Sequence, residues 1–197
     1  MTLADKFTFS RIILAPVFFI IYFLPDFFPA LFPNGSGWTV PVFWLVAIYA
    51  ELTDMFDGMA ARKYNEVSDF GKLFDPFADT IFQVTCFLCL VVDGIFPVVL
   101  FLLVLYREFG ILIIRNLMLK KGITMGARIG GKIKTVTYVV AGAVALLAVS
   151  IKRLEVFEFL FPYIKYCSIV IFAISVIFSL TSFYDYFSVY RKAEKNK

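Results

Sequence analysis

Two pairs of aspartates stand in a stretch of sequence that is otherwise apolar. Asp54 and Asp57 are three residues apart, and Asp75 and Asp79 are four apart. Residues at these spacings share one face of a helix. Carboxylates crowded in apolar surroundings repel one another and protonate unless cations lie between them. The chain has no histidine, and hard oxygen ligands suit Mg²⁺ or Mn²⁺. The sequence therefore predicts a site in which these four aspartates hold two divalent ions, an arrangement that clamps phosphoryl groups during displacement.

The neighbours of the aspartates suit a phosphate-containing substrate. Gly58 and Gly71 have no side chain, so a nucleotide or a metal can approach the backbone closely. Ala61 leaves room one turn beyond Asp57, and Arg62 offers a forked donor for a diphosphate. One membrane carboxylate alone is also explained by a proton relay, a counter-ion or a helix end. Four at this spacing, with these neighbours, favour phosphate chemistry.

The composition indicates a membrane protein. The chain has 197 residues, of which 61% are hydrophobic and 17% charged, with 25 phenylalanines. Soluble domains are about 45–50% apolar. The net charge of +4 is modest, and we expect no nucleic-acid partner. Cys86 and Cys89 form a CxxC inside an apolar run with no second pair elsewhere, so we interpret them as small core residues.

Six apolar segments are each near the length of about 20 residues that a membrane-spanning helix needs. They lie at about residues 7–24, 38–60, 72–92, 94–120, 131–151 and 159–187. The first segment lacks a small-residue cleavage site and is interpreted as a retained span. We therefore predict an all-α protein in which residues 1–197 form a single domain, a bundle of six transmembrane helices.

The distribution of Lys and Arg predicts the orientation of this bundle. An even number of spans puts both termini on one side, together with the aspartates and most of the basic residues. The other side keeps Lys152, Arg153 and Lys165. By the positive-inside rule, both termini and the metal site face the cytoplasm.

A second polar cluster lies within apolar segments and concerns the acceptor. Arg107 and Arg115 are eight residues apart, which is close to two helical turns, and Lys132 and Lys134 begin the fifth segment. Intramembrane arginines normally line an interior cavity. Several cations beside a metal site suit an acceptor that is itself phosphorylated. The alternative is that Arg107 pairs with Glu108 or another acid, while the lysines enforce topology.

The aspartate segment resembles the CDP-alcohol phosphatidyltransferase family. The family pattern D-x-x-D-G-x-x-A-R, eight residues, then G-x-x-x-D-x-x-x-D is met in full by Asp54, Asp57, Gly58, Ala61, Arg62, Gly71, Asp75 and Asp79. The resemblance implies transfer of a phosphatidyl or similar group from a CDP-linked donor to an alcohol, with release of CMP. It implies that the four aspartates hold the metals and that Asp79 is the base. It also implies a homodimer. The implied CDP pocket consists of Asp54, Asp57, Gly58, Ala61, Arg62, Gly71 and Asp75.

Further segments are similar to one branch of this family, the phosphatidylglycerophosphate synthases. These segments are "REF" followed by an arginine, "GKIKT", and an opening with Thr8, Arg11 and Pro16. The chain departs from that branch at Asp5 and Thr80, where Asn and Lys are usual. The resemblance implies a bacterial-type cytoplasmic membrane, CDP-diacylglycerol as donor, sn-glycerol 3-phosphate as acceptor, and Thr8 near the site. The implied acceptor-phosphate residues are Arg107, Arg115, Lys132 and Lys134.

Three alternatives remain open from the residues alone. The same chemistry could act on an inositol phosphate, inositol or a second phospholipid, since a phosphorylated inositol satisfies the cations equally well. An intramembrane prenyltransferase also uses aspartate-rich helices, but lacks the Gly-x-x-Ala-Arg continuation. A divalent-cation transporter explains the carboxylates and leaves Gly58, Ala61 and Arg62 unexplained.

Overall fold

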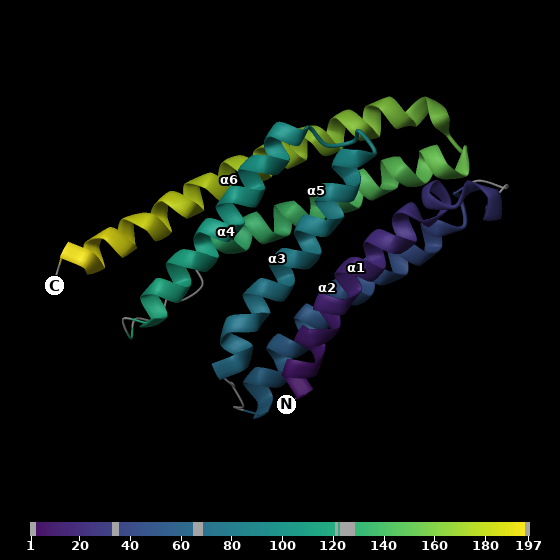
Figure 1. The fold of residues 1–197 in the computed structure, drawn as a ribbon. Helices are drawn as coiled ribbons and strands as arrows, with labels where there is room; N and C mark the ends of the chain where they lie inside the picture. Colours follow the sequence, from purple (N-terminus) through teal and green to yellow (C-terminus); the bar gives the residue numbers. More distant parts are fainter. Residues whose placement is uncertain (1–2, 33–35, 65–68, 121, 123–128, 196–197) are drawn as a thin grey trace.

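The computed structural model describes residues 3–32, 36–64, 69–120, 122 and 129–195, and within these ranges the side chains of residues 3–5, 54–64, 69–73, 129, 132, 193 and 195 lie outside the description. Every regular element in the described residues is a helix (Figure 1). The elements are α1 (Leu3–Phe27), η1 (Pro29–Leu31), α2 (Thr39–Tyr64), α3 (Asp69–Val92), α4 (Val98–Lys120), α5 (Ile129–Leu154), η2 (Glu158–Leu160) and α6 (Phe161–Lys195). The prediction of an all-α chain is confirmed.

The six long helices match the six predicted apolar segments, and the starts of α1 and α4 differ most from the prediction, by four residues each. The fourth segment was predicted from residue 94, whereas α4 begins at Val98. Gly94 has a positive φ of 70° and closes α3, because the Ile95 and Gly94 amides donate to the carbonyls of Leu90 and Val91. This is the Schellman arrangement that ends many helices at a glycine.

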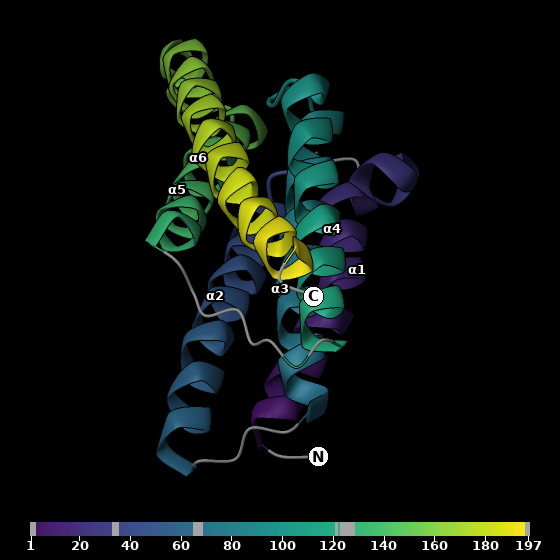
Figure 2. The ribbon, with the colours of Figure 1, turned by 90° about the vertical axis from the view of Figure 1, so that its left-hand side faces the viewer.

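The helices form two groups of three that face each other. α1 packs on both α2 and α3, while α6 packs on both α4 and α5. α3 joins the groups through α4 and α5, and α2 also reaches α5. Successive helices run in opposite directions (Figures 1 and 2). One end of the molecule, called here the site end, therefore holds the starts of α1, α3 and α5 and the ends of α2, α4 and α6.

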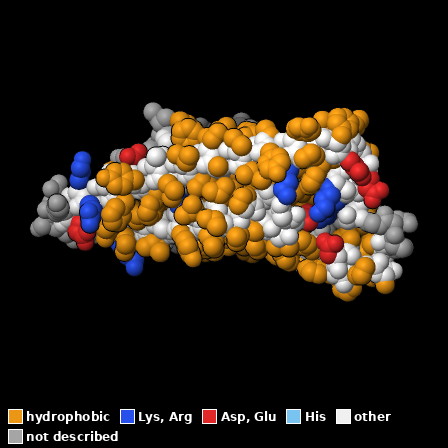
Figure 3. Space-filling view, turned by 90° about the horizontal axis from the view of Figure 1, so that it is seen from above, with side chains coloured by type: hydrophobic (Ala, Val, Ile, Leu, Met, Phe, Trp, Pro, Cys, Tyr) orange, Lys and Arg blue, Asp and Glu red, His pale blue; other side chains and the backbone are white. Residues whose placement is uncertain are grey.

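Four helices in the described part are long and apolar enough to cross a membrane: Lys6–Phe27, Phe74–Val92, Ile133–Leu154 and Glu158–Lys192. The apolar part of α2, Thr39–Thr53, is shorter. α4 is long enough but carries Arg107, Glu108 and Arg115. Apolar side chains cover most of the face in Figure 3, and charged ones gather toward its two ends. The described part of the chain is thus that of an all-helical membrane protein with four candidate spans, and the bundle of six spans stays a prediction.

Aromatic rings and small residues fill the space between the helices. Phe87, Phe96 and Phe172 from α3, the following turn and α6 contact one another, and the Phe96 and Phe172 rings stack with centroids 4.0 Å apart. The buried Ala141 and Ala145 on α5 let neighbouring helices approach closely. Cys89 belongs to this core and Cys86 packs against it, which confirms the interpretation of both cysteines as core residues.

A cluster of polar side chains connects the helices at the end of the molecule opposite the site end. Arg153 of α5 donates to the carbonyl of Tyr22 at 2.9 Å and to the Thr39 hydroxyl at 2.7 Å. Its guanidinium also lies 3.6 Å from a carboxylate oxygen of Asp93, which accepts the Tyr22 hydroxyl at 2.5 Å. One side chain therefore ties the ends of α1, α2, α3 and α5 together, far from the predicted site residues.

Candidate active site

A cavity of about 610 Å³ lies between the two helix groups. All six long helices contribute side chains to its wall. The polar part of the wall has two sides: carboxylates on α3, and cations on α4 and α5. The lining residues that carry charge are Arg11, Glu51, Asp75, Asp79, Arg107, Glu108, Arg115 and Lys134. Two groups of residues that sequence analysis assigned separately, to metals and to an acceptor, thus line one cavity.

The carboxylate side is built by α1 and α3. The Thr8 hydroxyl donates to Asp75 Oδ1, and Arg11 Nη1 contacts Asp79 Oδ1 at 2.6 Å. Arg11 is only 2% exposed, whereas the Asp79 side chain is 47% exposed. Asp75 and Asp79 are one turn apart on α3, so both line the same wall. Asp79 keeps an open side while Arg11 orients it from within the bundle.

The other aspartates of the predicted metal site lie outside the described side chains. Asp54 and Asp57 belong to α2, four and seven residues after Ala50, which lines the cavity. Gly58, Ala61 and Arg62 follow on α2, and Gly71 lies on α3. Nothing in the described residues tests how these positions contact a nucleotide.

The donors on this side fit a hard divalent cation. Asp75 and Asp79 offer carboxylate oxygens, and Thr8 supports one of them; the described residues that line the cavity include no sulfur or imidazole. Among the described residues no group of three or more His, Cys, Asp or Glu side chains could hold a metal ion. Two of the four predicted ligands lie outside that set, so the two-metal site stays a prediction.

The cation side centres on Glu108 of α4. Its Oε1 atom accepts a hydrogen bond from Arg107 Nη1 and one from Lys134 Nζ, both at 2.8 Å. All three residues are buried. The pairing of Arg107 with Glu108, left open by the sequence, is present. Arg107 and Lys134 nevertheless both line the cavity, so pairing with Glu108 does not remove them from it.

A further layer holds these two cations from behind. Arg107 Nε donates to the Ser179 carbonyl of α6 at 3.1 Å. The Lys134 ammonium lies 4.8 Å from the centre of the Tyr138 ring, and the Tyr138 hydroxyl donates to Ser179 Oγ at 2.7 Å. Arg107 and Lys134 are therefore positioned by α6 and α5 as well as by Glu108.

Arg115 lines the cavity two turns beyond Arg107 on α4, as the predicted shared face requires. Its guanidinium carbon lies 5.5 Å from the centre of the Tyr186 ring, and its Nη2 lies 3.5 Å from the Tyr186 hydroxyl. Its buried Nε has no hydrogen-bond partner within the described part of the chain. The Lys132 side chain lies outside that part. Arg115 therefore lines the cavity without a salt bridge to any described carboxylate.

The contributors that sequence analysis missed include Arg11, the partner of Asp79, and Tyr186, which lies beside Arg115. Arg11 was counted for topology and for the branch resemblance, and Tyr186 stood unmarked within a predicted span. The one sequence signal for Arg11 is that a buried arginine in an apolar helix needs an acid nearby.

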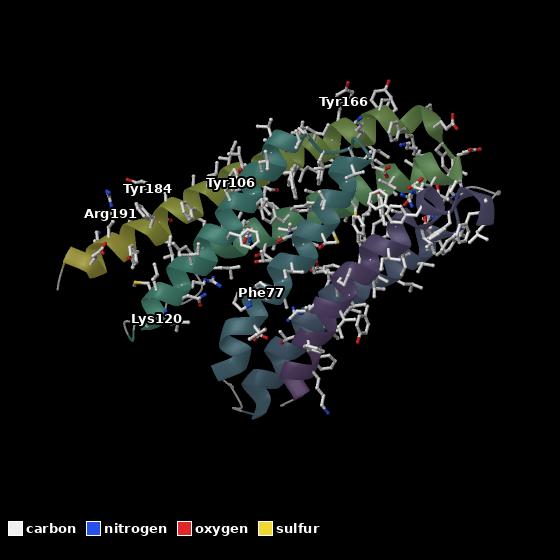
Figure 4. All side chains as sticks on the ribbon, viewed as in Figure 1. Phe77, Tyr106, Lys120, Tyr166, Tyr184 and Arg191 are labelled. Carbon is white, nitrogen blue, oxygen red and sulfur yellow. The ribbon has the colours of Figure 1, made fainter. Side chains whose placement is uncertain are left out.

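Other tyrosines on these helices differ from the buried Tyr186. Tyr106, Tyr166 and Tyr184 project outward from α4 and α6 (Figure 4), and they are 69%, 67% and 73% exposed.

Comparison with known proteins decides the family. The family model described as CDP-alcohol phosphatidyltransferase matches residues 1–181. The chain belongs to this family. It is therefore an enzyme of the CDP-alcohol phosphatidyltransferase type, a transferase of phospholipid biosynthesis, and the resemblance carried by the aspartate pattern is confirmed.

Individual relatives agree with this membership. The chain is 37% identical over 196 residues, 96% of its length and 89% of the relative, to CDP-diacylglycerol–glycerol-3-phosphate 3-phosphatidyltransferase of Treponema pallidum. It is 34% identical to the Bacillus subtilis protein of the same name, over 74% of this chain and 76% of that protein. It is 32% identical to a probable phosphatidylglycerophosphate synthase of Mycobacterium tuberculosis, over 75% of this chain and 67% of the relative.

Proposed function

We propose that this enzyme transfers the phosphatidyl group from CDP-diacylglycerol to sn-glycerol 3-phosphate, giving phosphatidylglycerophosphate and CMP. The observation that carries the proposal is the 37% identity, along 96% of the chain, to a relative named for this reaction. The cavity supports it, because carboxylates suited to a metal-bound diphosphate and cations suited to a phosphomonoester line opposite sides of one space.

The carboxylate side is the proposed donor site. Asp54, Asp57, Asp75 and Asp79 would hold two divalent ions, Mg²⁺ or Mn²⁺, which supply charge neutralisation at the diphosphate when bound. The proposed CDP contacts come from α2 and α3: Asp54, Asp57, Gly58, Ala61, Arg62, Gly71 and Asp75. Thr8 supports Asp75 through its hydroxyl, and would keep that carboxylate turned toward the cavity.

Asp79 is the proposed base. The acceptor hydroxyl oxygen forms a bond to the phosphorus of the phosphatidyl group, the bond from that phosphorus to the CMP oxygen breaks, and the hydroxyl proton passes to an Asp79 carboxylate oxygen. The open side of Asp79 supports this role, since a base must reach the proton that it takes. Arg11 limits the orientations of the carboxylate and would stabilise it as an anion before the proton arrives.

The cation side is the proposed acceptor site. Arg107, Arg115, Lys132 and Lys134 would bind the phosphate of sn-glycerol 3-phosphate, and Arg115 is the strongest candidate because it lines the cavity and makes no salt bridge within the described residues. Binding the phosphate here would direct the free hydroxyl end of the glycerol toward α3. Alcohols without an anionic group, such as inositol or choline, do not need these cations.

Further proposals concern the whole protein. We expect six membrane spans, with α2 and α4 completing the four candidates, and a site end that faces the cytoplasm together with both termini. Lys120 and Arg191, labelled in Figure 4, both lie at the site end, which supports this orientation. The family resemblance also supports a homodimer, which cross-linking in native membranes would test.

The proposed reaction is tested by offering the purified protein CDP-diacylglycerol, Mg²⁺ or Mn²⁺, and one acceptor at a time. Release of CMP with sn-glycerol 3-phosphate, and a lipid product whose mass matches phosphatidylglycerophosphate, are expected. CMP release with inositol 1-phosphate, inositol or a phospholipid instead would keep the chemistry and change the acceptor. Metal flux without CMP from any acceptor would contradict the proposal.

A further inference from the structure

Glu108 occupies the place among the cations that a bound phosphate is proposed to use. A single carboxylate oxygen, Oε1, accepts from both Arg107 and Lys134 at 2.8 Å. The three residues are 5%, 5% and 9% exposed, and all line the cavity. Two of the proposed acceptor-binding cations are thus already paired with an anion of the protein. An incoming phosphate must share or displace it.

Among the described side chains on this side, the net charge matches that of a phosphomonoester when Glu108 is counted. The described cavity-lining side chains of α4 and α5 include three cations, Arg107, Arg115 and Lys134, and one acid, Glu108. Their net charge is +2. A phosphomonoester carries about −1.5 to −2 at pH 7. Without Glu108 the same wall would carry one positive charge more than the ligand can neutralise.

The proposed reaction makes this balance matter, because it does not consume the phosphate of the acceptor. The new bond forms at the other end of the glycerol, so the product still carries the phosphomonoester. Cations that bind this group too tightly stabilise bound substrate and bound product equally. Such binding does not raise kcat at saturating substrate, and it slows the release of the product.

We propose that Glu108 is an internal competitor for the acceptor phosphate. While the acceptor site is empty, Glu108 pairs with Arg107 and Lys134. When the acceptor binds, its phosphate takes the place of the Glu108 carboxylate as the partner of these two cations. Glu108 pairs with them again as the product leaves. This inference rests on the proposed function. Glu108 acts through the two cations and is a positioning residue, not a base or a metal ligand.

Substitution of Glu108 by glutamine should change the charge of this wall more than its shape. The amide oxygen still accepts hydrogen bonds, and Arg107 and Lys134 keep their contacts with Ser179 and Tyr138. The expected result for Glu108→Gln is that the KM for sn-glycerol 3-phosphate and the steady-state kcat both fall about tenfold, since close charge pairs couple by at least that factor. The KM for CDP-diacylglycerol should stay within about twofold.

Pre-steady-state kinetics separate this role from a structural one. If product release has become slow, Glu108→Gln should show a burst of CMP close to one per active site, at the wild-type single-turnover rate. A merely structural defect slows the first turnover as well. An increase in the KM for sn-glycerol 3-phosphate, or the absence of a burst, would overturn the proposal.

A pair of variants keeps the test valid if Glu108→Gln does not fold. Lys134→Gln leaves a net charge of +1 on this wall, whereas Glu108→Gln combined with Lys134→Gln restores +2. The double variant should therefore have the lower KM for sn-glycerol 3-phosphate, by about tenfold. An equal or higher KM in the double variant would overturn the proposal. Failure of the proposed function would be seen earlier, as wild-type enzyme that does not release CMP with this acceptor.

Discussion

Replacing Arg115 by glutamine should weaken acceptor binding and leave donor binding intact. Arg115 lines the cavity and makes no salt bridge within the described residues, so its guanidinium can pair with a phosphate. Removing one partner of a buried charge pair costs about 2–5 kcal/mol. Arg115 is only partly buried, which places the loss near the lower end, about 2 kcal/mol. That loss corresponds to a rise of about 30-fold in the KM for sn-glycerol 3-phosphate.

The assay is CMP release in detergent micelles, with sn-glycerol 3-phosphate and CDP-diacylglycerol varied in separate series. The matched control is Lys120→Gln, which removes the same charge from the same helix at an exposed position outside the cavity. The control should leave both KM values within about twofold, as surface substitutions usually do. Equal increases in both KM values for Arg115→Gln would refute its assignment to the acceptor side.

The remaining predictions concern the base, the metals and two structural contacts. Asp79→Asn should lower kcat by at least about 100-fold while CDP-diacylglycerol still binds, because the amide cannot take the proton; near-normal CMP release would exclude Asp79 as the base. Chelation by EDTA should abolish CMP release and added Mn²⁺ or Mg²⁺ should restore it; activity that persists in EDTA would contradict a metal-held diphosphate. Arg153→Met removes the buried guanidinium that ties four helix ends and should lower the free energy of unfolding by about 3 kcal/mol, with both KM values unchanged; an unaltered thermal midpoint would contradict it. Gly110→Ala places a Cβ 2.9 Å from a ring of α6 and should lower the thermal midpoint by overpacking. Gly142→Ala is the control, because its Cβ meets its nearest ring atom at 3.6 Å. Equal midpoints in the two variants would contradict overpacking at Gly110.

The positions of the helices were largely predictable because hydrophobic length is a local property of the sequence. The predicted segment at residues 72–92 lies within α3, and the one at residues 38–60 begins one residue before α2 and ends four residues before it does. The start of α4 was misplaced because Gly94 closes α3 with a turn, which an apolar run conceals. α6 continues to Lys195, since amphipathic and basic residues can extend a helix beyond its apolar part.

The site was predictable in its residue types and less so in its contacts. The spacing of Asp75 and Asp79, and of Arg107 and Arg115, correctly placed each pair on one wall of the cavity. The contacts of Arg11 with Asp79 and of Lys134 with Glu108 join different helices, α1 to α3 and α5 to α4. Such pairings depend on how the helices pack, which hydrophobic periodicity does not specify. Tyr186 was missed for the same reason.

The central claim is that one cavity has a donor side on α3 and an acceptor side on α4 to α6. It is tested most directly by ligand-induced thermal stabilisation of two variants, Asp75→Asn and Arg115→Gln, with Mn²⁺ present. sn-Glycerol 3-phosphate should raise the midpoint of Asp75→Asn as it does that of the wild type, and should not raise that of Arg115→Gln. CDP-diacylglycerol should show the reverse pattern. If one variant lost stabilisation by both ligands, or if both variants kept stabilisation by both ligands, the division of the cavity into two sides would be contradicted.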